Sequence, residues 1–86
     1  KHSEHIKVID DALLWKRLIN GDEKAFSNLF EKYFNQLVLY GCSFSSNEDK
    51  VKDCIQDVFV DVWLYKESLN ENISPKIYLL SSVRKR

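Results

Sequence analysis

The chain has few of the residues that turns and irregular loops require. Its 86 residues include only two glycines and one proline. A sandwich or barrel of short strands needs many tight turns and positive-φ positions, which glycine and proline supply. Their scarcity therefore argues against an all-β fold. With 44% hydrophobic residues, the chain has enough apolar side chains to form one small helical core.

Cysteine and net charge are also scarce. Cys42 and Cys54 form no CxxC pair, so neither a disulfide framework nor a zinc site is predicted. Thirteen basic residues balance thirteen acidic ones, so no overall charge draws the chain to nucleic acid or to a membrane surface. No apolar run approaches the ~18 residues of a membrane span. These features predict a soluble, cytoplasmic protein without a membrane partner.

Signatures of catalysis are missing as well. The sequence contains no Gly-rich phosphate loop, no HExxH and no GxSxG motif. His2 and His5 lie in residues 1–9, which we expect to be a flexible N-terminal segment. Cys54 falls on the apolar stripe of a helix, where a small buried side chain is expected more often than a nucleophile. We therefore expect no enzymatic activity and no cofactor or metal.

Four helices are predicted within residues 10–86, which we take as one all-α bundle. Asp10 and Asp11 can cap the first helix, Asn20-Gly21 can end it, and Asp22 can cap a longer second helix whose pattern fades at Gly41. The expected apolar positions are Leu13, Leu14, Leu18 and, as a further candidate, Trp15 in the first helix, and Phe26, Leu29, Phe30, Tyr33, Phe34, Leu37 and Val38 in the second.

The second half of the chain shows two further helices. Val51, Cys54, Ile55, Val58, Phe59, Val62 and Trp63 recur at helical spacing, which predicts a third helix that ends near residue 65 or 66. Residues 67–74 have no sustained period and are predicted to be a loop. Ser74 before Pro75 is a strong start signal for a fourth helix over residues 76–86. No stop signal follows this helix and residue 1 is not methionine, so we expect the natural chain to continue.

The third predicted helix has an outer face of mixed character. At ~100° per residue, the side away from the apolar stripe gathers acids, a glutamine and two aliphatic residues. These residues are Asp53, Gln56, Asp57, Val60, Asp61 and Leu64. Aspartates spaced four residues apart repel one another mildly, which a purely solvated face usually avoids. The pattern favours a basic partner with a hydrophobic seam, and a solvated face with two incidental aliphatic residues is the alternative.

The end of the chain is basic. From Lys76 to Arg86 there are four basic residues and no acid. Together with the preceding loop, this segment supplies the candidate nucleic-acid contacts Asn70, Asn72, Lys76, Tyr78, Ser81, Ser82, Arg84, Lys85 and Arg86. Basic, hydroxyl and aromatic groups suit contact with phosphates and unpaired bases. A basic last turn also complements the helix dipole, and that simpler explanation stays open.

Three stretches are similar to a known family in their order and spacing. They are AFSNLFEKY (residues 25–33), DCIQDVFVDVW (residues 53–63) and YLLSSVRK (residues 78–85). They resemble the second conserved region of extracytoplasmic-function sigma factors, with the patterns A-F-x-x-L-[FY]-x-x-Y, D-x-x-Q-[DE]-x-F-x-x-x-W and Y-L-[YF]-x-[IV]-x-R-N. The resemblance covers residues 12 to 86 of this chain, nearly its whole length.

The resemblance implies a domain of an alternative sigma factor. The helix with Asp53, Gln56 and Asp57 would dock on the clamp-helix coiled coil of the RNA polymerase β′ subunit. Residues 67–86 would recognise the −10 promoter element as melted, single-stranded non-template DNA, with one everted base in a loop pocket. Lys85 stands where the family commonly has asparagine. The region that binds the −35 element, region 4, is absent from this chain, and an anti-sigma factor is left open as a further partner.

A different class of function is the rival. A helical protein-interaction module could bind polymerase or a regulator without reading DNA. The balanced net charge and the pair Ser81-Ser82, where the family often has a basic and a branched residue, favour this alternative. The polar loop and the basic helix favour the DNA-reading domain.

Overall fold

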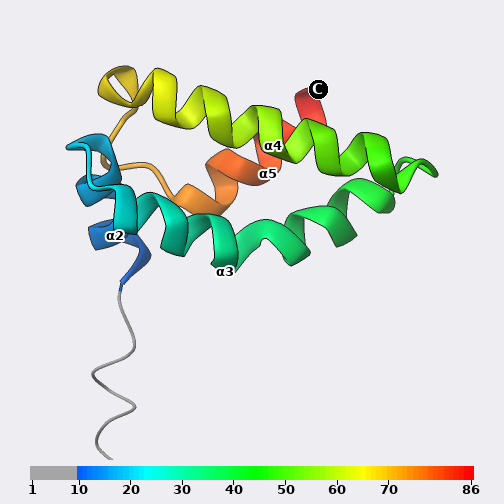
Figure 1. Ribbon diagram of the computed structural model, residues 1–86, viewed down its shortest axis with the longest axis horizontal. Helices are drawn as coiled ribbons and strands as arrows, with labels where there is room; N and C mark the ends of the chain where they lie inside the picture. Colours follow the sequence, from blue (N-terminus) through cyan, green and yellow to red (C-terminus); the bar gives the residue numbers. More distant parts are fainter. Residues whose placement is uncertain (1–9) are drawn as a thin grey trace, which may run out of the picture.

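The computed structural model describes residues 10–86, and this part of the chain is all-helical. Its elements are α2 (Asp11–Ile19), α3 (Glu23–Cys42), α4 (Glu48–Leu64), the short 3₁₀ helix η1 (Lys66–Ser68) and α5 (Pro75–Lys85). Helix α3 packs against α2, α4 and α5, and α4 also packs against α5. Figure 1 shows α3 and α4 running along the length of the molecule. The predicted all-α bundle of four helices is confirmed.

Capping side chains mark where each helix begins. Each N-cap side chain accepts a hydrogen bond from a backbone N–H in the first turn that follows it. The four N-caps are Asp10, Asp22, Asn47 and Ser74. Pro75 takes the first position of α5, where its missing N–H is harmless. Helix α5 therefore begins one residue before the predicted start and ends at Lys85, with Arg86 as its C-cap.

The chain reverses between α2 and α3 at a glycine. Gly21 has a φ of 96°, a conformation that strains residues with a Cβ. Its N–H donates to the carbonyl of Leu18 at 2.9 Å, and the N–H of Asp22 donates to the carbonyl of Arg17 at 2.9 Å. This pair of bonds is a Schellman motif. The predicted stop at Asn20-Gly21 is confirmed, and it lets α2 turn back onto α3.

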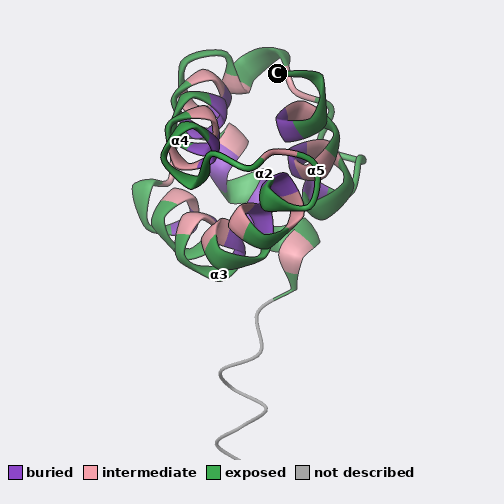
Figure 2. Cartoon of the chain, turned by 90° about the vertical axis from the view of Figure 1, so that its right-hand side faces the viewer, coloured by how far each residue is buried: buried purple, intermediate pink, exposed green. Residues whose placement is uncertain are grey.

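The core lies where the helices face one another (Figure 2). The buried hydrophobic residues are Leu14, Trp15, Leu18, Ala25, Leu29, Tyr33, Leu37, Val51, Ile55, Val58, Phe59, Val62, Leu79 and Val83. One predicted core position is wrong, because Leu13 is 43% exposed while Trp15 is only 1% exposed. Three consecutive apolar residues spread over about 200° of a helix, so they cannot all face one core. The two that face inward are Leu14 and the larger Trp15.

Helices α3 and α4 approach closely at Gly41. A Cβ added to Gly41 would lie 2.5 Å from Cγ1 of Val51, far inside the optimal carbon–carbon separation of about 3.5–4.0 Å. Glycine is therefore the residue that lets the two helices pack here. The sequence pattern fades at this position, but α3 continues to Cys42. The glycine marks a helix contact and not the end of the helix.

One carboxylate links α2 to α3. Asp11 accepts hydrogen bonds from Nζ of Lys32, at 2.5 Å, and from the Tyr33 hydroxyl. Partial burial opposes ionisation of Asp11, but these hydrogen bonds outweigh it and hold the pKa of its carboxyl below the ordinary value. Burial, together with the hydrogen bond to Asp11, raises the pKa of Tyr33 to about 12. The protonated phenol is thus the form that the fold requires.

We expect the fold to lose stability in alkaline solution. The pKa of Tyr33 is raised from 10.0 to about 12, so the unfolded chain releases this proton before the folded one. The contribution of Tyr33 is complete below its unfolded pKa and is lost as the pH rises toward 12. Thermal midpoints measured by circular dichroism against pH should show this loss. Tyr33→Phe should reduce it, whereas Tyr65→Phe, at an exposed tyrosine, should not; equal losses in both variants would contradict the assignment.

Candidate functional site

The outer face of α4 presents the six residues predicted from helical spacing. Five of them are exposed and Asp61 is half-buried. Val60 and Leu64 are 53% and 64% exposed, so two aliphatic side chains one turn apart face solvent on this helix. Asp57 and Asp53 stand on the same face, about one and two turns before Asp61. We refer to Asp53, Gln56, Asp57, Val60, Asp61 and Leu64 as the α4 face.

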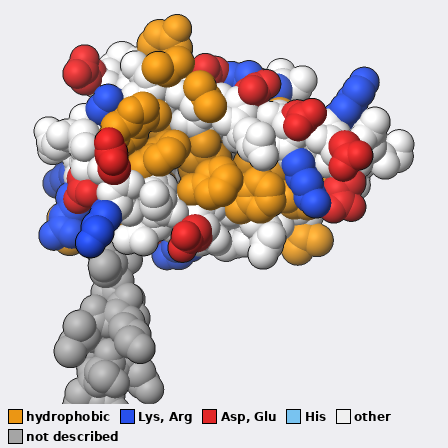
Figure 3. Space-filling model, viewed as in Figure 1, with side chains coloured by type: hydrophobic (Ala, Val, Ile, Leu, Met, Phe, Trp, Pro, Cys, Tyr) orange, Lys and Arg blue, Asp and Glu red, His pale blue; other side chains and the backbone are white. Residues whose placement is uncertain are grey.

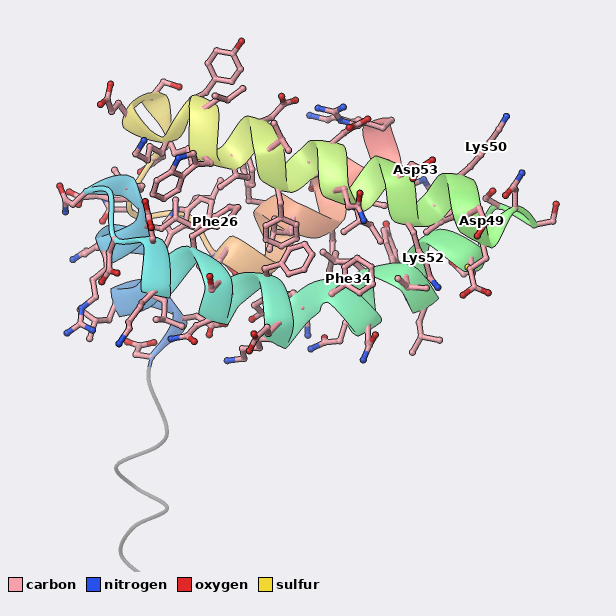
Figure 4. All side chains as sticks on the ribbon, in the orientation of Figure 1. Phe26, Phe34, Asp49, Lys50, Lys52 and Asp53 are labelled. Carbon is pink, nitrogen blue, oxygen red and sulfur yellow. The ribbon has the colours of Figure 1, made fainter. Side chains whose placement is uncertain are left out.

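An apolar groove lies beside the α4 face, where α4 meets α3. It encloses about 370 Å³ and is lined by Phe26, Ser27, Phe30, Glu31, Gln56, Phe59 and Val60. Figure 3 shows hydrophobic surface running between the two helices, with charged side chains around it. In Figure 4, Phe26 and Phe34 project from α3 on the side that faces α4. Gln56 and Val60 belong to both the groove and the α4 face, so the two form one continuous surface.

Packed aromatic rings form the walls of this groove. The ring of Phe59 meets Phe30 edge to face at 4.9 Å and Phe26 at 6.0 Å between centroids. Phe26 also packs on Trp63 at 5.2 Å, and Nζ of Lys66 lies 4.2 Å from the Trp63 ring centroid. Contacts of this kind hold the rings in place, so the groove is a preformed surface.

Phe26 and Phe30 were predicted on the apolar stripe of the second helix, and both pack against the core. The sequence did not predict that they also line a surface groove. Both are half-buried. The available signal was the width of the apolar stripe on the second helix. Seven apolar positions over four turns cover more of a helix than one core contact can bury, so part of the stripe had to reach the surface.

The loop before α5 is fixed by a buried tryptophan. Nε1 of Trp15 donates a hydrogen bond of 2.9 Å to the carbonyl of Asn70, and its ring lies 5.5 Å from that of Tyr78. The side chain of Asn70 in turn accepts the N–H of Asn72 at 2.8 Å. Trp15 therefore positions both the loop and the aromatic residue of α5. The contact joins residues 55 positions apart in the chain, so no local pattern could have predicted it.

The nine candidate DNA-contact residues are spread along α5 and its preceding loop, and the structure brings Tyr78, Ser82, Lys85 and Arg86 together around one shallow hollow. Asn70, Asn72, Lys76 and Tyr78 lie around the start of α5, whereas the other five lie toward its end. At 1.5 Å per residue, about 15 Å of helix separates Lys76 from Arg86. We call these groups the loop cluster, with Asn70, Asn72, Lys76 and Tyr78, and the C-terminal cluster, with Ser81, Ser82, Arg84, Lys85 and Arg86.

Two arginines of the C-terminal cluster already have partners. Arg86 forms an ion pair with Asp61 of α4, and the guanidinium of Arg84 lies 4.9 Å from the centroid of the Phe44 ring. The Arg86–Asp61 pair joins the C-terminal cluster to the α4 face. Lys85 is exposed. Of the three consecutive cations, Lys85 is thus the one free of these contacts.

The two serines differ in their environment. Ser82 is half-buried and its hydroxyl donates a hydrogen bond of 2.8 Å to the carbonyl of Tyr78 within α5. Ser81 is exposed, so its hydroxyl is the one available to an external partner. Tyr78 is half-buried beside Trp15, which leaves only part of its ring open for stacking.

Cys54 was predicted on the apolar stripe of the third helix, and it lies at the edge of the core. It is half-buried, and its Sγ is 4.0 Å from the carbonyl oxygen of Val83. Burial raises the pKa of the Cys54 thiol, and the Asp57 charge acts in the same direction while Arg86 opposes it. The thiolate is therefore disfavoured at this position.

Between residues 10 and 86, no group of three or more His, Cys, Asp or Glu side chains is placed to hold a metal ion. None of the helices in this part of the chain combines the length and apolar character that a membrane crossing requires. The predicted flexible segment 1–9, with His2 and His5, lies outside the described residues.

Comparisons of this chain with protein-family models, with curated proteins and with solved structures find no match. The features of the chain that bear on function are an acidic, partly apolar face on α4 and a polar loop followed by a basic helix.

Proposed function

We propose that this chain is the region 2 domain of an alternative sigma factor of the extracytoplasmic-function type. In this role the α4 face docks on the β′ clamp helices of RNA polymerase, and residues 67–86 hold the −10 promoter element as melted DNA. In this role the domain is cytoplasmic and carries out no catalytic step, because polymerase performs the chemistry. One observation supports this function above the others. The acidic α4 face, with its exposed aliphatic residues, is joined by the Asp61–Arg86 ion pair to the basic helix α5, and a fixed polar loop precedes that helix.

The α4 face suits a basic coiled coil. Asp53 and Asp57 supply negative charge that no ion pair within residues 10–86 uses. Val60, Leu64 and the adjacent groove supply apolar surface for a hydrophobic seam. Interfaces commonly combine such an apolar centre with a charged rim, which steers the partner and sets its orientation. The groove adds Phe26 and Phe30 of α3 to the surface that the clamp helices would cover.

The loop cluster suits an unpaired base. Extruding a base from the stack costs a few kcal/mol, which a fixed pocket can offset through stacking and hydrogen bonds. Trp15 already holds Asn70 and Tyr78 in place, so the loop loses less conformational freedom on binding. Lys76 is exposed beside the loop and can neutralise an adjacent phosphate.

Binding to labelled oligonucleotides tests the DNA-reading role. We expect the domain to prefer the single non-template strand of a −10 element over duplex of the same sequence. With at most four cations on phosphates, and ~0.7 counterions released per contact, the log–log salt slope should be no steeper than about −3. Fluorescence anisotropy at several salt concentrations measures both quantities.

Variants of Lys85 separate a phosphate contact from base reading. If Lys85 touches phosphate, Lys85→Gln should flatten the salt slope by less than one unit, by the ~0.7 counterions of a single contact. If it reads a base, the variant should lose discrimination among −10 sequences. Lys16→Gln, at an exposed lysine of α2, is the matched control and should change neither quantity.

A protein-interaction module that does not read DNA is the second candidate. Two contacts favour it: Arg86 is paired with Asp61, and the Ser82 hydroxyl is bonded to Tyr78, so both groups are already engaged within the domain. Equal binding of single strand and duplex, with no preference among −10 variants, would remove the DNA-reading role and leave this module in its place.

A further inference from the structure

A second hollow lies where the end of α3, the start of α4 and the end of α5 meet. It encloses about 390 Å³, within the range of about 300–1,000 Å³ that small-molecule sites occupy. It is separate from the groove beside the α4 face, since the two share no lining residue. In Figure 1 this end of the molecule is opposite the loop that precedes α5.

The walls of the hollow are apolar. Phe44, Val51 and Val83 line it together with the half-buried Cys54. Phe44 is 44% exposed, a large exposed fraction for an aromatic side chain, and its ring is held edge-on by Tyr40 at 5.3 Å. Phe44 thus presents apolar surface beside two buried valines, with the Arg84 guanidinium 4.9 Å from its ring centroid.

Three cations line the hollow and no acidic residue does, although Asp53 and Asp57 line an adjoining hollow that shares Lys50, Cys54 and Arg86 with it. The three cations are Lys50, Arg84 and Arg86. The guanidinium of Arg84 lies over the Phe44 ring and takes part in no ion pair within residues 10–86. Arg86 shares its charge with Asp61, and Figure 4 shows Lys50 extended away from the bundle. Arg84 is therefore the cation best placed to receive an anion.

We propose that this hollow binds a small anion with a flat apolar body, such as an aromatic carboxylate. The apolar body would pack against Phe44, Val51 and Val83, which removes apolar surface from water. The carboxylate would lie at Arg84, whose planar donors match a carboxylate in a bidentate manner. This site lies outside the α4 face but shares Arg84 and Arg86 with the C-terminal cluster. Its test involves neither polymerase nor DNA, so it can fail without affecting the proposed function.

Two-dimensional amide NMR spectra of the whole chain with naphthoate test the proposal. We expect saturable shifts concentrated at Phe44, Val51, Cys54, Val83 and Arg84. Naphthalenemethanol, which lacks the charge, should bind at least about tenfold more weakly, the effect of losing one charge-assisted contact. Sulfate keeps a charge but lacks the apolar body, so it should also bind at least about tenfold more weakly because it buries no apolar surface. Octanoate tests the shape of the apolar body and should also bind more weakly.

Matched arginine variants locate the anion contact. Arg84→Gln should weaken naphthoate binding by about tenfold, whereas Arg17→Gln, at an exposed arginine of α2, should not. The same spectra show whether each variant is folded. The proposal is overturned if naphthalenemethanol binds as well as naphthoate, if the shifts fall in the Phe26 and Phe30 groove, or if folded Arg84→Gln binds as wild type does. Tighter binding of octanoate than of naphthoate would contradict the proposal that the ligand has a flat apolar body.

Discussion

Phe59→Ala is expected to unfold the domain or bring it close to unfolding. Phe59 is 2% exposed and its ring packs edge to face against Phe30 and Phe26. Removing a buried phenylalanine side chain costs about 3–5 kcal/mol, whereas a whole domain is stable by only about 5–15 kcal/mol. A chain of this size lies near the lower limit of that range. Urea denaturation followed by circular dichroism measures the change in the free energy of unfolding.

The next residue provides the control for this experiment. Val60 follows Phe59 on α4 but is 53% exposed, so Val60→Ala should change the free energy of unfolding by no more than about 0.5 kcal/mol. A pair of adjacent substitutions with such different effects would show that burial, and not helix propensity, decides the outcome. Similar urea midpoints for Phe59→Ala and wild type would contradict the packing described for the α3–α4 contact.

Asp57→Lys is expected to abolish retention of the domain by core RNA polymerase. Asp57 is exposed in the centre of the α4 face, one turn from Asp53 and one turn from Asp61. Losing one partner of a desolvated charge pair costs about 2–5 kcal/mol, which corresponds to a loss of affinity of about 30-fold or more. Co-purification with core polymerase, followed by a titration with labelled domain, measures this loss.

Stability measurements separate a binding defect from a folding defect in this variant. The three aspartates of the α4 face repel one another, so a lysine at position 57 should leave the fold as stable as before or slightly more stable. Glu67→Lys makes the same change of charge at an exposed position of η1, outside the α4 face, and should keep wild-type retention. Full retention of Asp57→Lys by polymerase would remove the docking role from this face.

The two variants test different properties of the same helix. Phe59 holds α4 against α3, and Asp57 faces away from that contact. Folding should fail in Phe59→Ala whatever the function, and, if the proposed function is correct, Asp57→Lys should fold but not bind polymerase. A folded Asp57→Lys that still binds polymerase would leave the bundle intact as a structure and would require another partner for the acidic face.

Much of the fold could be predicted from local sequence, because the signals are local. Asp22 and Ser74 cap helices through hydrogen bonds to residues two or three positions away, and Gly21 ends α2 through its own backbone conformation. The period of about 3.6 residues placed Ile55, Val58 and Phe59 on the buried side of α4. The same period placed Asp57 and Val60 on its outer side, so the α4 face was also predictable.

Other features depended on contacts between distant segments. Periodicity could not decide which of Leu13 and Trp15 faces the core, because the partner of Trp15 is the carbonyl of Asn70 in a loop 55 residues away. The Arg86–Asp61 pair joins residues 25 positions apart, and the groove at Phe26 exists only because α3 and α4 meet there.

The sequence alone therefore determined the helices, their caps and the side of each helix that is apolar, since these follow from interactions within a few residues. Only the tertiary structure decided which apolar residues are fully buried, which cations are already paired and where the hollows lie. The physical reason is that burial, ion pairing and cavity shape are properties of the packing between helices, and a one-dimensional pattern specifies the face of a helix but not what that face meets.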